Sequence, residues 1–287
     1  MFKRFALALI AALAAALPAG AQPPIWVIRD QDSTIVLFGS VHMLPPGLDW
    51  RPAALDTALQ QANDIWFELP LDATDSQAAA QIAATRGLLP KGERLSAKLS
   101  PAGRRRLEKA AAAMNLSLPA LDRMRPWLAE VTLGVAELAN GGANGSDGVE
   151  RTLDQAAPAT ADRRAFETPE QQIAFFADTP EKDQVASLED TLREMEENPG
   201  AYPDLVKAWM AGDLGALERQ GLKPMRRAAP TLYRRLVAER NARWAEAISQ
   251  RLQGSGETVV VVGAAHLIGQ DGVPALLRRR GIKVEGP

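Results

Sequence analysis

Only two histidines occur among the 287 residues of the chain, His42 and His266, and both lie in the same sequence pattern. Residues 34–43 and residues 258–267 each contain Thr, four apolar residues, Gly, two small or branched residues, His, and finally Met or Leu. The segments begin at residues 34 and 258, 224 residues apart, so a local repeat does not explain their likeness. Imidazole groups bind metal ions and transfer protons near neutral pH. The pattern therefore predicts one site that uses both histidines.

Each of these segments reads as a buried strand followed by Gly-x-x-His. A continuously apolar strand is typical of a sheet that helices cover on both faces. Open α/β sheets place their ligand sites just beyond the carboxyl ends of the strands, which is where His42 and His266 would fall. A single histidine in such a place is more often a hydrogen-bonded structural group. Two histidines in the same context favour a functional role.

Two carboxylates end other apolar runs of the sequence. Glu68 follows the run 65–67, and Glu167 follows Phe166 at the end of a weaker strand pattern. A carboxylate is costly to bury without a partner, so we expect each to meet a cation, a metal or a hydrogen-bond donor. An exposed strand end is the alternative, and it has more weight for Glu167, which lies next to a helix start.

Arg240 lies within a helix predicted over residues 230–253. It occupies the gap in a row of apolar residues spaced by four, namely Leu232, Leu236, Trp244 and Ile248. Two interpretations stay open at this point. The guanidinium reaches solvent along its aliphatic stem, or it is drawn toward a carboxylate or an anionic substrate group.

Alternating strand and helix patterns define the elements that must position these residues. Apolar runs predict strands at 25–28, 35–38, 64–69, 163–167, 258–262 and 283–285. Helical patterns fill the intervals, with the longest stretch between the third and fourth strands. The fold class is therefore α/β, with a central mostly parallel or mixed sheet flanked by helices. We expect residues 22–287 to form a single domain that carries a helical insertion at about 71–160.

The composition excludes several classes of function. The formal charge is −2 and no extended basic patch occurs, which argues against nucleic acid as a partner. The chain has no cysteine, and this removes disulfides, thiolate metal sites and cysteine nucleophiles.

The N-terminus has the features of a signal peptide. A basic start at Lys3 and Arg4 precedes an apolar run over residues 5–17, and a small-x-small sequence comes next. The pattern predicts cleavage after Ala21 and a periplasmic or secreted protein with no stable membrane insertion. A buried first helix is the alternative.

Several segments together resemble the TraB/PrgY/GumN family. They are Gly39-Ser40-Val41-His42, Phe67-Glu68, Gly148-Val149-Glu150, Glu167-Thr168 with Gln171, Glu239-Arg240-Asn241 with Arg243-Trp244, and Gly263-Ala264-Ala265-His266-Leu267. The resemblance covers the whole chain after the N-terminal segment, in the right order. One departure is Glu150, where the family pattern has aspartate. The family is related to the Tiki metalloproteases and, more distantly, to erythromycin esterase-like and haem-binding ChaN-like proteins.

The resemblance implies a metal-dependent hydrolytic centre formed by His42, Glu68 and His266. The expected cofactor is a divalent ion, Mn, Co or Zn, and the expected substrate is a peptide or a small molecule. Three ligands leave room for a water molecule, as a catalytic metal requires. Arg240, Glu167 and Asn241 are the predicted substrate-binding residues.

Two alternatives to the metal centre stay open. One is a metal-free, esterase-like hydrolase in which one histidine is the general base and Glu68 or Glu167 orients it. The other is a non-enzymatic periplasmic protein that binds a ligand such as haem in the same cleft, or that has a regulatory role.

Overall fold

The structure is a computed structural model that describes residues 22–287. The predicted signal peptide, residues 1–21, lies outside the described residues. Within the described part of the chain, no helix has the length and apolar character needed to span a membrane.

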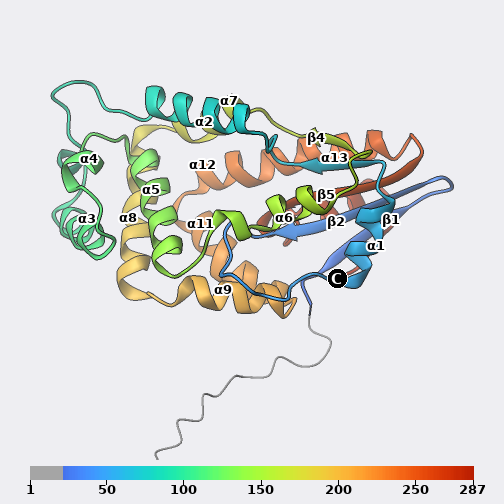
Figure 1. The fold of residues 1–287 in the computed structure, drawn as a ribbon. Coiled ribbons are helices and arrows are strands. Elements are labelled where there is room, and N and C mark those ends of the chain that lie inside the picture. Colours follow the sequence, from blue (N-terminus) through green and yellow to red (C-terminus); the bar gives the residue numbers. More distant parts are fainter. Residues whose placement is uncertain (1–21) are drawn as a thin grey trace, which may run out of the picture.

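A mixed six-stranded sheet forms the centre of the fold, in the strand order β4-β3-β5-β2-β1-β6 (Figure 1). The strands are β1 (Ile25–Arg29), β2 (Ser33–Ser40), β3 (Asp64–Phe67), β4 (Asp162–Ala165), β5 (Gly256–Gly263) and β6 (Val284–Glu285). Strands β4, β3, β5 and β2 run parallel, whereas β1 is antiparallel to both of its neighbours. The α/β class predicted from the sequence is confirmed.

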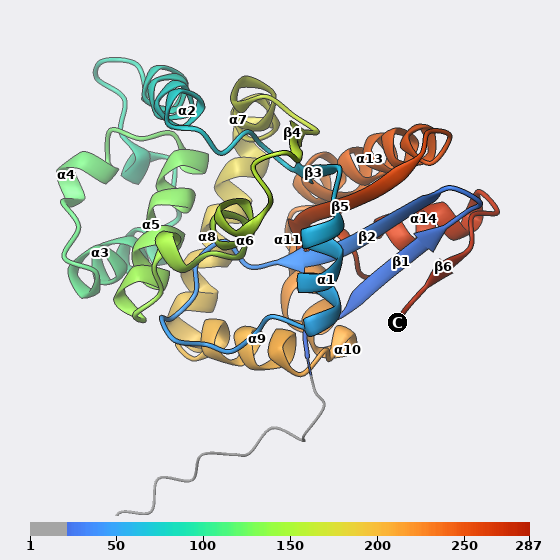
Figure 2. The ribbon, with the colours of Figure 1, turned by 45° about the vertical axis from the view of Figure 1, so that its right-hand side comes forward.

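Helices cover both faces of this sheet. Helix α1 and helix α6 lie on one face, and α13 and α14 lie on the other (Figures 1 and 2). The helices are α1 (Ala53–Gln61), α2 (Ala73–Arg86), α3 (Pro101–Ala113), α4 (Leu118–Leu121), α5 (Pro126–Asn140), α6 (Val149–Ala156), α7 (Pro169–Ala177), α8 (Glu181–Glu197), α9 (Ala201–Met210), α10 (Leu214–Leu217), α11 (Lys223–Ala228), α12 (Pro230–Tyr233), α13 (Glu239–Arg251) and α14 (Val273–Arg279).

The two Gly-x-x-His segments come after strands that are direct neighbours. Strand β2 pairs in parallel with β5 over its whole length, from Ser33 opposite Gly256 to Ser40 opposite Gly263. Both strands are buried because helices cover them, which explains their continuous runs of Val, Ile, Leu and Phe. The histidines therefore start from adjacent strand ends.

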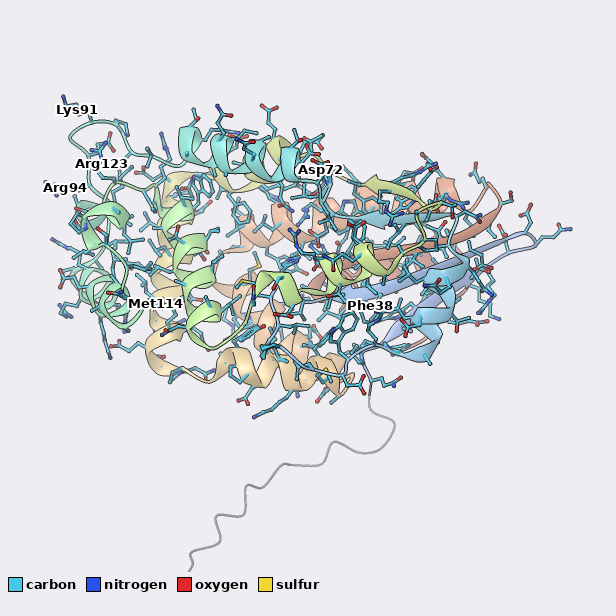
Figure 3. All side chains as sticks on the ribbon, in the orientation of Figure 1. Phe38, Asp72, Lys91, Arg94, Met114 and Arg123 are labelled. Carbon is cyan, nitrogen blue, oxygen red and sulfur yellow. The ribbon has the colours of Figure 1, made fainter. Side chains whose placement is uncertain are left out.

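A second, smaller group of helices packs beside the sheet, and we call α3, α4, α5 and α8 the helical lobe (Figure 2). Its apolar core is separate from that of the sheet and consists of Leu89, Leu95, Leu99, Leu107, Ala111, Leu121, Ala129, Leu133, Leu188 and Leu192. Figure 3 shows Phe38 inside the sheet layer, whereas Lys91 and Arg94 project from the far end of the lobe.

The helical lobe differs in composition from the insertion predicted at about 71–160. Helix α8 lies outside that range but contributes Leu188 and Leu192 to the core of the lobe. Helix α6 lies inside the range but packs Val149 and Leu153 into the core of the sheet. Each helix joins the core that its buried apolar stripe faces, whatever its place in the chain order.

Candidate active site at the carboxyl edge of the sheet

Four site residues lie just beyond the four parallel strands, at the same edge of the sheet. His42 comes two residues after β2, Glu68 directly after β3, and Glu167 two residues after β4. His266 ends a short 3-10 turn, Ala264–His266, directly after β5. Because the carboxyl ends of parallel strands meet at one edge, these side chains converge, and His266 Nε2 lies 3.8 Å from Glu68 Oε1.

Gly263 provides the space in which the convergence takes place. A Cβ atom at this position would lie 3.1 Å from Glu68 Oε1 and 3.8 Å from His42 Nε2. The contact with the carboxylate would be tighter than ordinary van der Waals packing allows. Glycine at the start of the second Gly-x-x-His segment therefore leaves room for the functional groups of both neighbouring strands.

Arg240 forms a buried ion-pair network with the two strand-end glutamates. Its guanidinium Nη2 donates to Glu68 Oε2 at 2.5 Å, and its Nε donates to Glu167 Oε1 at 2.9 Å. The residue is only 4% exposed and lies over the ring of Trp244, 4.6 Å from the ring centroid. The alternative in which this guanidinium reaches solvent is wrong, because two carboxylates that end apolar strands require a buried cation.

The remaining donor of Arg240 is also engaged. Nη1 donates to the backbone oxygen of Leu236 and to His266 Nε2, at 3.1 Å in both cases. Leu236 belongs to a π-helical segment, Arg234–Ala238, which joins α12 to α13. Short π segments often mark functional positions in helices, and this one directly precedes the residues that reach the site.

His266 is held from behind by Asn241. Its Nδ1 donates to Asn241 Oδ1 at 2.6 Å, and the amide Nδ2 of Asn241 donates to the backbone oxygen of Asp271 at 2.7 Å. Asn241 is fully buried, so its geometry is that of a residue that positions His266. Burial lowers the pKa of His266 to about 4, which makes the imidazole neutral at pH 7 with its Nε2 lone pair directed into the site.

The Nδ1 partner of His42 is a carboxylate, whereas that of His266 is an amide. His42 Nδ1 donates to Glu150 Oε1 at 2.6 Å, and the same oxygen accepts a hydrogen bond from the Ser40 hydroxyl at 2.5 Å. The charge of Glu150 raises the pKa of His42 to about 9. The side chain of His42 is 68% exposed, in contrast to that of His266 at 8%.

Glu150 is the site residue that the sequence patterns did not single out. The metal-free alternative gave the role of orienting a histidine to Glu68 or Glu167, but Glu150 orients His42 and Asn241 orients His266. The segment Gly148-Val149-Glu150 could have indicated this role, because it is one of the segments that resemble the family pattern. Glutamate here keeps the carboxylate that aspartate supplies in that pattern.

Gly148 brings this glutamate within reach. A Cβ atom on Gly148 would lie 2.1 Å from the backbone oxygen of His42, so only glycine permits the close approach of the two chain segments. The next residue, Val149, donates its backbone N–H to the oxygen of Val41 at 3.1 Å. The start of α6 is thereby fixed against the segment that carries His42.

The two strand-end glutamates differ in their electrostatic environment. Burial disfavours the charged form of Glu68, but His266 and the Arg240 guanidinium outweigh burial and lower its pKa to about 2. For Glu167, burial is the larger effect and raises the pKa above its ordinary value, although Arg240 opposes this. The carboxylate of Glu68 is therefore ionised over the whole physiological pH range.

A cavity of about 280 Å³ adjoins these groups. Its lining consists of His42, Phe67, Glu68, Leu69, Leu71, Gly145, Gly148, Glu150, Arg151 and Gln172. The cavity gives a ligand direct access to His42 and Glu68, whereas His266 lies on the buried side of the site.

The donor types and tautomers of the site fit a divalent metal. Both imidazoles use Nδ1 for a hydrogen bond to a side-chain oxygen, so that Nε2 is the ring nitrogen of each that faces the site. Arg240, however, engages Glu68 and His266, two of the three predicted ligands. Within residues 22–287, no group of three or more His, Cys, Asp or Glu side chains is arranged to hold a metal ion.

The fold and the site define an α/β protein whose titratable side chains gather at the carboxyl edge of a mixed sheet. The sequence model of the TraB/PrgY/gumN family matches residues 24–286, and the chain belongs to this family.

The chain is also similar to individual proteins. It is 26% identical to "Uncharacterized protein YbaP" of Escherichia coli (strain K12) over 244 residues, which cover 84% of this chain and 87% of the relative. It is 24% identical to an "Uncharacterized protein" of Treponema pallidum (strain Nichols) over 271 residues, which cover 89% and 80%. No solved structure matches the chain significantly.

Proposed function

We propose that the strand-end site hydrolyses an amide or ester bond as a metal-dependent, peptidase-like hydrolase. His42, Glu68 and His266 would hold a divalent ion, Mn, Co or Zn. The observation that carries this proposal is the matched hydrogen bonding of the two histidines at Nδ1. Each binds a side-chain oxygen through Nδ1 and presents Nε2 toward the region beside Glu68.

Hydrogen bonds of this kind support a ligand role for both histidines. Histidines that bind metals almost always donate their other N–H to a carboxylate, a carbonyl or water, which fixes the ring and its tautomer. Glu150 and Asn241 are such partners here. A divalent ion bound at this set would lower the pKa of its water and polarise the carbonyl of a substrate.

Two of the three proposed ligands, Glu68 and His266, are in the protonation state that binds a metal. Arg240 holds Glu68 in its ionised form, as a ligand must be, and it balances the charge of Glu167 at the same time. Burial keeps His266 neutral, so that its Nε2 carries a lone pair. The apolar rings of Phe175 and Trp244 flank the guanidinium and limit the access of water to the network.

A specific observation supports the metal-free hydrolase as the second candidate. Arg240 already supplies a cation to Glu68 Oε2 and to His266 Nε2. In this mechanism Nε2 of the neutral form of His42, which is the minor form at pH 7 and is held by Glu150, takes a proton from the attacking water and returns it to the leaving amine or alcohol. Water is then consumed, and an acid and an amine or alcohol are released.

Metal content of the purified protein distinguishes the two candidates. We expect the wild type to hold Mn, Co or Zn at neutral pH, measured by mass spectrometry of the metals. His42→Ala, Glu68→Gln and His266→Ala should each weaken metal binding by about tenfold or more. Glu108→Gln, at an exposed position of α3, is the matched control and should bind metal like the wild type.

Turnover of a peptide library, with and without a chelator, completes the test. Hydrolysis that the chelator abolishes supports the metal centre. Hydrolysis that survives chelation but is lost in His42→Ala would support the metal-free mechanism in place of the metal centre. A wild type without metal, or ligand-site variants that bind metal as well as the wild type, would contradict the metal proposal. Ligand binding without any hydrolysis supports the non-enzymatic alternative.

A further inference from the structure

The lining of the cavity at the proposed catalytic site includes one positively charged side chain that has no partner among residues 22–287. Of the lysines and arginines in the described part of the chain, only Arg151 lines this cavity. Neither an ion pair nor a side-chain hydrogen bond engages its guanidinium among the residues that the structure describes. Arg151 is exposed and comes directly after Glu150 on α6.

The other charges that face this cavity are already matched. Glu68 pairs with Arg240, and Glu150 pairs with His42. Among the described residues that line the cavity, Arg151 is therefore the one whose charge has no charged partner. A planar guanidinium with five N–H donors suits the two oxygens of a carboxylate, which it can bind in a bidentate manner.

The lining of the cavity also includes apolar side chains. They are Phe67, the last residue of β3, and Leu69 and Leu71 on the segment that follows it. The volume of about 280 Å³ is near the lower limit of ligand pockets, roughly 300 Å³. Such a space accepts a small ligand, or the end of a longer one, that combines an apolar group with a negatively charged group.

We infer that Arg151 is a specificity-determining residue that binds a carboxylate of the substrate. The substrate class is then a molecule or chain end in which an apolar group and a free carboxylate lie close to the bond presented to His42 and Glu68. A peptide with an apolar C-terminal residue has this chemistry. The assignment of the bond to be cleaved rests on the proposed hydrolytic function, whereas the binding of the carboxylate does not.

A pair of matched peptides tests the inference by binding alone. The two peptides are N-acetyl-dileucine with a free carboxylate and N-acetyl-dileucine amide. Each is titrated into the mature protein in the presence of a chelator, and binding is measured by isothermal titration calorimetry. We expect the wild type to bind the acid about fivefold more tightly than the amide, as befits a partly exposed charge pair. Arg151→Gln should abolish this preference without changing the affinity for the amide.

Two further variants serve as controls. Arg151→Lys keeps the charge and should retain part of the preference. Arg105→Gln removes an exposed arginine of α3, in the helical lobe, and should leave the preference unchanged. The inference is overturned if the wild type binds acid and amide equally, if it binds neither, or if Arg151→Gln still prefers the acid. A preserved preference in a protein without hydrolytic activity would refute the proposed function and leave this inference in place.

Discussion

The pKa values of His42 and His266 differ strongly because the surroundings of the two imidazoles differ. A neighbouring carboxylate raises the pKa of His42 to about 9, and burial lowers that of His266 to about 4. At neutral pH without metal, the first imidazole is charged and the second is neutral. Pairs of titratable groups with pKa values moved apart are typical of sites that transfer protons or bind metals.

The His42–Glu150 pair gives a prediction for the pH dependence of stability. The pKa of His42 is higher in the folded state than the ordinary value of 6.5, so the pair stabilises the fold below about pH 6.5 and loses this effect as the pH rises through about 9. Glu150→Gln should therefore destabilise the chelated protein at pH 6.5 and have a smaller effect at pH 9.5. The loss should be about 1 kcal/mol or less, because His42 is 68% exposed.

Urea unfolding of both proteins at the two pH values measures this difference. The double variant His42→Gln/Glu150→Gln is the control, because it contains no titrating imidazole at this position. Its unfolding free energy relative to His42→Gln should not depend on pH in this range. A loss in Glu150→Gln that is the same at both pH values would contradict the assigned ion pair.

Arg240→Ala should destabilise the fold far more than a substitution of a surface arginine. It leaves the buried carboxylates of Glu68 and Glu167 without their cation, and such a loss typically costs about 3–5 kcal/mol. The free energy of unfolding in urea measures it. The triple variant Glu68→Gln/Glu167→Gln/Arg240→Met contains no charge in this network and should recover much of the loss. A cost below about 1 kcal/mol for Arg240→Ala would mean that water reaches the glutamates.

At the scale of elements, the strand ends were the most predictable part of the molecule. The apolar runs before His42, Glu68 and His266 identify parallel strands, and parallel strands bring the residues at their carboxyl ends to one edge. Glu150 could not be found in this way, because it lies at the start of a helix. Its place depends on the close packing of Gly148 against the backbone of His42, which no periodicity reports.

Gly148 gives a prediction for this packing. Gly148→Ala should cost about 2 kcal/mol or more, because its Cβ would lie 2.1 Å from the His42 oxygen and the backbone would have to move. Gly145→Ala is a control three residues earlier, where a Cβ would meet nothing within 4 Å. It should be neutral or slightly stabilising. Thermal melts of the two variants measure the contrast, and equal effects would refute the packing argument.

At the scale of the whole molecule, the sequence indicated an α/β domain but not the composition of the helical lobe. Leu188 and Leu192 have the helical spacing of any buried stripe, and this spacing does not say which core they enter. Assigning α8 to the lobe depends on contacts with α3 and α5, which are distant in the chain. Long-range packing of this kind is not encoded in a local pattern.

The export of the chain is a separate prediction for the whole molecule. The basic start and the apolar run before Ala21 predict a mature protein that begins at Gln22. Intact-mass measurement of protein from the periplasm or the medium of a bacterial host checks this. A variant with Ala19→Asp and Ala21→Asp should stay uncleaved, because small residues are required at those two positions. Protein that starts at Met1 and stays in the membrane fraction would refute the prediction.

In the register of β2 against β5, the two Gly-x-x-His segments are offset by one residue. Ser40, and not Gly39, pairs with Gly263. Successive residues of a strand point to opposite faces, so this shift sends the chain along a different course after each strand. One imidazole ends in contact with bulk water and the other ends inside the protein. The first can exchange protons directly with the solvent, whereas the second can pass them only through its hydrogen-bond partners. Two similar segments of sequence thus give the site one histidine that exchanges protons directly with water and one that does not.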